Sequence, residues 1–135
     1  MVFAYLMNNH FYKNDTFDCG MYNGYVGITP DENKLPDSWM SGGSFDIENP
    51  LYNSIRVHGG ITFDRVWTDQ WYPKEKVIQY PLTEVPEDVI GSRIIGFDTS
   101  HIDSDSSMDY EWCKSETLYL RDQILWLLGK DIWEN

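Results

Sequence analysis

Two short segments carry the side chains that are best suited to chemistry. The first is Val57-His58-Gly59-Gly60-Ile61-Thr62-Phe63, and the second is Ile95-Gly96-Phe97-Asp98-Thr99-Ser100-His101. The candidate catalytic residues in them are His58, Thr62, Asp98 and His101. An imidazole oriented by a carboxylate can act as a general base, and two histidines with a carboxylate can bind a divalent metal ion. Ligand binding or a purely structural role is the remaining alternative, because an aspartate such as Asp98 can also cap a turn.

The spacing of these residues decides whether they can act together. On a regular strand His58 and Thr62 share one face. His101 can join Asp98 only if the second strand ends before it. If the two strands are neighbours in a sheet, we expect all four side chains to converge. The Gly59-Gly60 pair predicts a bulge or the close approach of another backbone.

Two patterns of charged residues could indicate ion binding, but each also has a structural interpretation. An acidic run beginning at Asp103 alternates like a calcium-binding loop, but it has Met108 where the turn needs glycine and Lys114 where a glutamate is needed. We therefore interpret it as the solvated entry to a helix. Three arginines on or beside the predicted strands can either bind an anion or pair with local carboxylates; they are Arg56, Arg65 and Arg93.

An aromatic cluster with one acidic neighbour follows the first segment. Its members are Trp67, Asp69, Trp71 and Tyr72. Exposed Trp and Tyr side chains are favoured where a protein partner docks, so we take these four as candidate partner-binding residues. The alternative is that they cover the hydrophobic core.

The composition limits the classes of function. The chain has 135 residues, a formal net charge of −12, and 41% hydrophobic and 16% aromatic residues, which is enough apolar material for a packed core. The negative charge disfavours direct binding to nucleic acid or to an anionic membrane surface, and it favours a partner protein with a basic surface. A small phosphorylated ligand remains compatible with local arginines or backbone N–H groups. No cofactor is expected.

The cysteines and the lack of a long apolar segment indicate where in the cell the protein is expected. Cys19 and Cys113 are too few for a disulfide framework and form no CxxC pair. A reducing cytoplasm is therefore expected. We recognise neither a signal peptide nor an apolar stretch of about 18 residues, so no membrane association is expected.

Hydrophobic patterning predicts four strands followed by one helix. The predicted strands cover residues 2–8, 22–29, 55–67 and 93–99. Loop-like segments separate them at 30–54, with a short helical turn near 36–40, and at 68–92. Strands followed by a helix indicate one α+β domain over residues 1–135, with the helix packed on one face of an antiparallel sheet.

The carboxy-terminal helix has the clearest pattern. Its inward stripe recurs at steps of three and four residues and consists of Cys113, Thr117, Leu120, Ile124 and Leu127. Asp109 and Glu111 suit the positive end of the helix dipole, and Ser107 is the candidate cap. Gly129 with Lys130 suits the end of the helix.

The two opening segments, together with Gly24-Tyr25-Val26-Gly27 and a helix containing Asp122-Gln123-Ile124, resemble a group of small proteins encoded in bacteriophage and prophage genomes. The resemblance covers roughly residues 20–128. The chain departs from the usual Gly-Asp pair of that group after the second histidine, where it has Ile102-Asp103. The resemblance implies a viral protein in the host cytoplasm and leaves the chemistry open.

These observations favour a phage accessory protein that acts by binding. The expected target is a host protein, such as a defence or nucleic-acid-binding factor, or a small signalling ligand, and the expected result is antagonism of host defence. The alternative is a His/Asp-dependent hydrolase of a phosphorylated small molecule, with His58, Asp98 and His101 as its working residues and possibly assisted by a metal. A virion or assembly protein is a third possibility.

Overall fold

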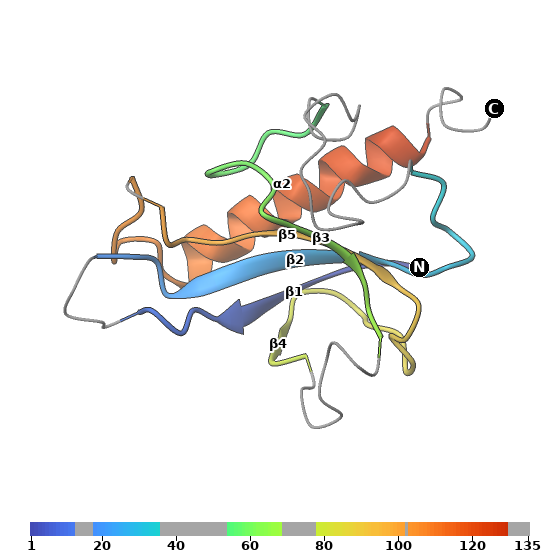
Figure 1. Cartoon of the computed structure of the whole chain (residues 1–135), viewed down its shortest axis with the longest axis horizontal. Helices are drawn as coiled ribbons and strands as arrows, with labels where there is room; N and C mark the ends of the chain where they lie inside the picture. Colours follow the sequence, from blue (N-terminus) through green and yellow to red (C-terminus); the bar gives the residue numbers. More distant parts are fainter. Residues whose placement is uncertain (13–17, 36–53, 69–77, 102, 130–135) are drawn as a thin grey trace.

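The structure is a computed structural model, and it describes residues 1–12, 18–35, 54–68, 78–101 and 103–129. One antiparallel sheet lies against one helix (Figure 1). Its elements are β1 (Val2–Asn8), β2 (Tyr22–Ile28), β3 (Phe63–Val66), β4 (Tyr80–Pro81), β5 (Arg93–Phe97) and α2 (Tyr110–Leu128). The strand order across the sheet is β3-β5-β2-β1-β4. The predicted α+β class, an antiparallel sheet packed by the carboxy-terminal helix, is confirmed.

The sheet is buried on both faces at its centre. Along β1, Ala4 and Leu6 belong to clusters that include residues of α2, whereas Phe3 and Tyr5 pack with Trp67 on the opposite face. This alternation follows from the two-residue period of a strand. The segment between β4 and β5 contributes side chains to the second face. The central strands therefore make a rigid platform from which the loops at their ends project.

The predicted strands are confirmed in part. Residues 2–8 form β1 as predicted, β2 ends one residue before the predicted limit of 29, and β5 ends at Phe97 rather than at residue 99. The predicted strand over 55–67 is wrong for its first half, because only Phe63–Val66 pairs as β3. The earlier part of that segment bonds to side chains of α2 instead of to a strand. The short edge strand β4 was not predicted.

Helix α2 lies against β1 and β2 through the predicted stripe (Figure 1). All five residues of that stripe are buried. The side chain of Asp109 accepts a hydrogen bond from the Trp112 N–H at 3.0 Å, so Asp109 is the N-cap and the assignment of the cap to Ser107 is wrong. The Ser107 side chain bonds to Asp105 instead. Gly129 ends the helix as predicted.

The choice of cap can be checked by substitution. Asp109→Ala is expected to lower the free energy of unfolding by about 0.5–2 kcal/mol, because the Trp112 N–H at the start of α2 loses its acceptor. Ser107→Ala is the matched control and should stay within about 0.5 kcal/mol of the unmodified protein. Urea unfolding followed by circular dichroism measures both. A larger loss in the Ser107 variant than in the Asp109 variant would contradict the observed cap.

A buried ion pair joins β3 to β5. Arg93 donates from Nε to Asp64 Oδ1 at 2.9 Å and from a terminal nitrogen to Asp64 Oδ2 at 2.8 Å. Their side chains are 2% and 0% exposed. Of the two roles predicted for the arginines, pairing with a local carboxylate therefore applies to Arg93. No helix within the described ranges combines the length and the apolar character that crossing a membrane would require.

Candidate functional site

His58 lies on a segment that runs along α2. The Gln123 side chain accepts from the Arg56 N–H and donates to the Arg56 carbonyl, both at 2.8 Å. Glu116 Oε1 accepts from the His58 N–H at 2.9 Å. The imidazole of His58 then packs edge-on against Trp112, with ring centroids 5.3 Å apart. These contacts explain why the segment leaves the sheet, and they fix the position of His58.

A tight turn follows immediately at Gly59 and Gly60. The Gly60 N–H donates to the Val57 carbonyl at 2.8 Å, and the two glycines have φ angles of 69° and 79°. A positive φ is costly for residues with a Cβ. A Cβ on Gly59 would also collide with the ring of His101. The predicted close approach is therefore to a side chain rather than to a backbone, and His58 and Thr62 do not share a strand face.

Asp98 and His101 form the other half of the site, in the loop after β5. Asp98 Oδ1 accepts from the Ser100 N–H at 2.9 Å. The carboxylate therefore caps a turn, which is the structural role predicted as an alternative for Asp98. The same oxygen lies 3.3 Å from His101 Nε2. This His101 nitrogen is buried and has no hydrogen-bond partner among the described residues, because the contact with Asp98 is an ion-pair distance without hydrogen-bond geometry. It is a polar atom with spare bonding capacity.

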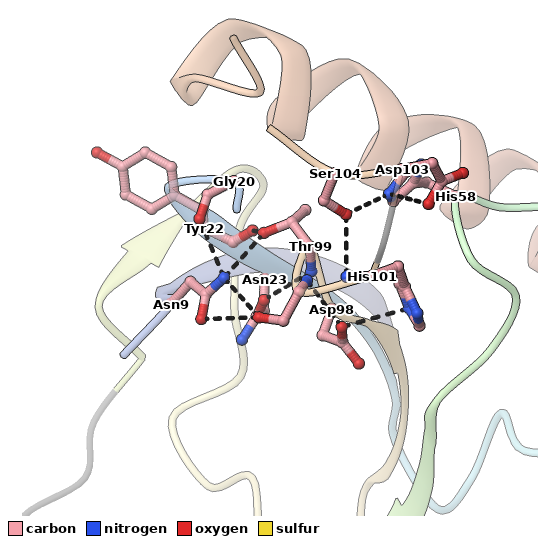
Figure 2. Close-up of polar contacts among 11 residues, drawn as sticks. Asn9, Gly20, Tyr22, Asn23, His58, Asp98, Thr99, His101, Asp103 and Ser104 are labelled. Atoms are coloured by element: carbon pink, nitrogen blue, oxygen red, sulfur yellow. Dashed lines mark hydrogen bonds and ion pairs between the residues drawn. The ribbon is translucent and has the colours of Figure 1, made fainter. Parts of the chain in front are cut away.

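Asn9 anchors this loop from the end of β1 (Figure 2). Its side-chain nitrogen donates to the Gly20 carbonyl, to Thr99 Oγ1 and to Ser100 Oγ at 3.0, 3.2 and 2.9 Å. Asn9 is 5% exposed and Thr99 is fully buried. The loop that carries Asp98 and His101 is therefore bonded to the platform on its inner side.

Ser104 links the two histidines. Its hydroxyl oxygen lies 2.7 Å from His58 Nε2 and accepts from the His101 N–H at 3.1 Å. Sequence reasoning missed this residue because Asp103-Ser104-Asp105 reads as ordinary solvated loop. A serine three residues after a histidine can close a local turn, and this spacing is the only signal that the sequence offers. Figure 2 shows the serine hydroxyl bonded to the ring of His58 and to the backbone nitrogen of His101.

We call the set His58, Asp98, His101 and Ser104 the two-histidine corner. The rings of His58 and His101 have centroids 5.8 Å apart and an interplanar angle of 69°. Exposure falls from Asp98 and His101, whose side chains are 34% and 30% exposed, to His58 at 11%. The exposed carboxylate of Asp103 lies 3.8 Å from His58 Nε2. The corner is thus a partly open polar site bordered by acidic side chains.

The other predicted site residues have different positions. The Thr62 N–H donates to the Gly96 carbonyl at 3.0 Å and so extends the β3–β5 pairing. No side-chain contact joins Thr62 to the corner within the described residues. Trp67 is 4% exposed and packs with Phe3 and Tyr5. It therefore covers the core, which was the predicted alternative to partner binding. Asp69, Trp71 and Tyr72 lie outside the described residues.

Some other titratable side chains have raised pKa values, which limits their use as nucleophiles or bases. Burial raises the pKa of the Cys113 thiol to about 11 and also raises that of Cys19, so both cysteines stay protonated near neutral pH and are poor nucleophiles. Burial and the Asp98 carboxylate raise the pKa of Tyr25 to about 12. Within the described part of the chain, no group of three or more His, Cys, Asp or Glu side chains is arranged to hold a metal ion.

The two glycines of the turn offer a matched pair of variants. Gly59→Ala and Gly60→Ala both place a Cβ at positive φ, which costs roughly 1–2 kcal/mol each. Only the Gly59 variant also pushes against the His101 ring, since nothing lies within 4 Å of a Cβ on Gly60. We expect the histidine ring resonances of His101 to shift strongly in Gly59→Ala and little in Gly60→Ala, as measured by NMR. Equal shifts would show that the ring does not rest on Gly59.

Comparison with known proteins does not assign this chain to a family. No protein-family model, no curated protein and no solved structure matches the chain. The function is therefore argued from the contacts described above.

Proposed function

We propose that this chain is an accessory protein of a bacteriophage or prophage that binds a small signalling ligand at the two-histidine corner. The observation that supports this best is the approach of His58 and His101, whose ring centroids lie 5.8 Å apart although the residues come from separate segments. Binding in the host cytoplasm would withdraw the ligand from a host defence. The phage origin rests on the resemblance of the two segments that carry these histidines.

The corner has the properties of a recognition site for a polar ligand. His101 Nε2 is buried and lacks a hydrogen bond among the described residues. A buried polar atom without a partner costs free energy, roughly 1–3 kcal/mol, which a bound ligand can recover. Asp98 and Asp103 supply acceptors beside it, with side chains 34% and 70% exposed. A ligand with both donor and acceptor groups therefore fits better than an apolar one.

Trp67 gives no support to docking of a protein at the predicted aromatic cluster. This residue was a candidate for protein docking, yet it is 4% exposed and packs beneath the surface. An aromatic side chain contributes to a protein interface only when the partner can cover it. The corner, by contrast, combines exposed and buried polar atoms within one small region.

Native mass spectrometry tests the proposal on protein purified from host cells without chelator. We expect a mass excess of a small molecule that is lost in His58→Ala and in His101→Ala. The third histidine of the chain, His10, is exposed and outside the corner, so His10→Ala is the control and should keep the excess. A bare mass for the unmodified protein, or an excess kept in both corner variants, would contradict the proposal.

A second candidate function is hydrolysis of a phosphorylated small molecule. Two contacts favour it: His101 Nε2 lies 3.3 Å from Asp98, and His58 Nε2 lies 2.7 Å from the Ser104 hydroxyl. A histidine beside a carboxylate and a histidine beside a hydroxyl are the two elements of general acid–base catalysis. Substituting either histidine by alanine should then abolish turnover and leave the melting temperature nearly unchanged. A large fall in melting temperature would indicate a structural role instead.

A further inference from the structure

We propose that Ser104 is a nucleophile activated by His58, and that the group it attacks is a phosphodiester. The inference rests on the second candidate function and deepens it, because it assigns the attacking atom and the class of substrate. Its basis is one hydroxyl that contacts the imidazole of His58 and the backbone N–H of His101.

The hydroxyl of Ser104 is positioned so that its hydrogen points to a base. A serine oxygen carries one hydrogen and two lone pairs. One lone pair accepts from the His101 backbone N–H at 3.1 Å, and we assign the hydroxyl hydrogen to the 2.7 Å contact with His58 Nε2. The second lone pair is then available for attack. This assignment places the remaining imidazole hydrogen of His58 on Nδ1.

The base is held rigidly. His58 is fixed through its backbone by Glu116 and through its ring by the edge-on contact with Trp112. Only 11% of its side chain is exposed. A histidine held within hydrogen-bond distance of a hydroxyl is the arrangement that activates serine as a nucleophile. The rigidity keeps the pair together without cost at the moment of reaction.

The second histidine supplies charge stabilisation. The imidazole of His101 borders the corner, and its Nε2 lies 3.3 Å from Asp98 Oδ1. Its ring centroid is 5.8 Å from that of His58. An imidazole N–H donor beside a phosphoryl group stabilises its oxygen atoms as they gain charge. We assign to His101, whose ring approaches that of His58, the donation of a proton to the leaving oxygen.

The acidic border selects the substrate class. Asp98, Asp103 and Asp105 lie in or next to the corner, and Ser107 donates to Asp105 through its hydroxyl and its N–H. These hydrogen bonds lower the pKa of Asp105 and keep it charged. Three carboxylates repel a phosphomonoester, which carries close to two negative charges near neutral pH. A phosphodiester carries one charge and is repelled less.

The reaction balances without a co-reactant other than water. Ser104 Oγ forms a bond to phosphorus, its proton passes to His58 Nε2, and the bond to one ester oxygen breaks as His101 protonates that oxygen. Water then attacks the phosphoseryl diester and gives its proton to His101. The Ser104 Oγ–phosphorus bond breaks and His58 returns the proton to the serine. The products are an alcohol and a phosphomonoester.

A small organophosphorus fluoride tests the nucleophile directly. The probe forms the Ser104 Oγ–phosphorus bond, releases fluoride and transfers the serine proton to His58, and it suits a serine that is only 5% exposed. Peptide mass spectrometry should find the label on Ser104. Labelling should vanish in Ser104→Ala, slow by about 10²–10⁴-fold in His58→Gln, and stay unchanged in Ser106→Ala, whose serine is exposed in the same loop. Label spread over several serines, or none on Ser104, would overturn the assignment.

Turnover separates this inference from the function on which it rests. Bis(p-nitrophenyl) phosphate and p-nitrophenyl phosphate report the diester and the monoester through the same coloured product. Release from the diester alone, lost in Ser104→Ala, supports the inference. Diester turnover that survives in Ser104→Ala overturns the nucleophile and keeps the hydrolase, and faster release from the monoester overturns the substrate class. No release from either compound, in protein that is also not labelled, overturns both.

Discussion

Replacing Asp64 by alanine is expected to lower the free energy of unfolding by about 3–5 kcal/mol. The substitution leaves the Arg93 guanidinium, 2% exposed, without the carboxylate that accepts two of its hydrogen bonds. A buried charge that loses its partner keeps its full desolvation penalty. Because the pair joins β3 to β5, the loss should weaken the edge of the sheet that lies next to the corner. Denaturant unfolding followed by tryptophan fluorescence measures the change.

The solvated pair Arg121–Asp122 is the control for this experiment. Its nitrogen and oxygen lie 3.3 Å apart, and the two side chains are 30% and 66% exposed. Exposed pairs contribute little, so Asp122→Ala should change the free energy of unfolding by no more than about 0.5–1 kcal/mol. A similar small loss for Asp64→Ala would mean that water reaches Arg93 and that the pair is not a buried one.

Asn9→Ala is expected to cost about 1–3 kcal/mol and also to weaken the corner. Asn9 is 5% exposed and its amide donates to three acceptors, one of which is the fully buried Thr99 hydroxyl. Removing the amide leaves buried polar groups without their donor. The loop that positions Asp98 and His101 then loses its bonds to β1. Unfolding by urea gives the stability change, and the ring resonances of His101 report the change at the corner.

The control for Asn9 is Asn33, whose side chain makes a single described hydrogen bond, in which it accepts from the Leu35 N–H at 3.3 Å. Asn33→Ala should cost less than about 1 kcal/mol and leave the His101 resonances in place. If Asn9→Ala destabilises the protein but leaves those resonances unchanged, the loop is positioned by other contacts. The anchoring role assigned to Asn9 would then be wrong.

The parts of the fold that the sequence predicts are those with a strong local period. The stripe from Cys113 to Leu127 indicates α2 because its 3.6-residue repeat extends over several turns. Strands β1, β2 and β5 are short apolar runs bounded by polar turns, which the pattern also identifies. The segment 55–62 has the same local character, yet Gln123 and Glu116 of α2 take its backbone hydrogen bonds. That competition depends on residues far along the chain and leaves no local signal.

The candidate site, like the fold, could be predicted from the sequence only in part. Asp98, His58 and His101 are identified by residue type, and His58 and His101 do approach each other. Their approach comes from a turn at Gly59 rather than from neighbouring strand faces. Ser104 and Asn9 were missed because their roles depend on the distances that the loops create, and a loop serine or asparagine looks the same in sequence whether it contacts solvent or another loop.

The two-histidine corner requires that the rings of His58 and His101 lie together in solution. Nuclear Overhauser effects between the ring protons of His58 and His101, recorded on isotope-labelled protein, measure this. With centroids 5.8 Å apart, we predict cross-peaks between the two histidine rings and from His58 to the ring of Trp112. In Gly59→Ala the cross-peaks between the histidines should be lost. Cross-peaks to Trp112 without any between the two histidines would contradict the two-histidine corner and every function proposed for it.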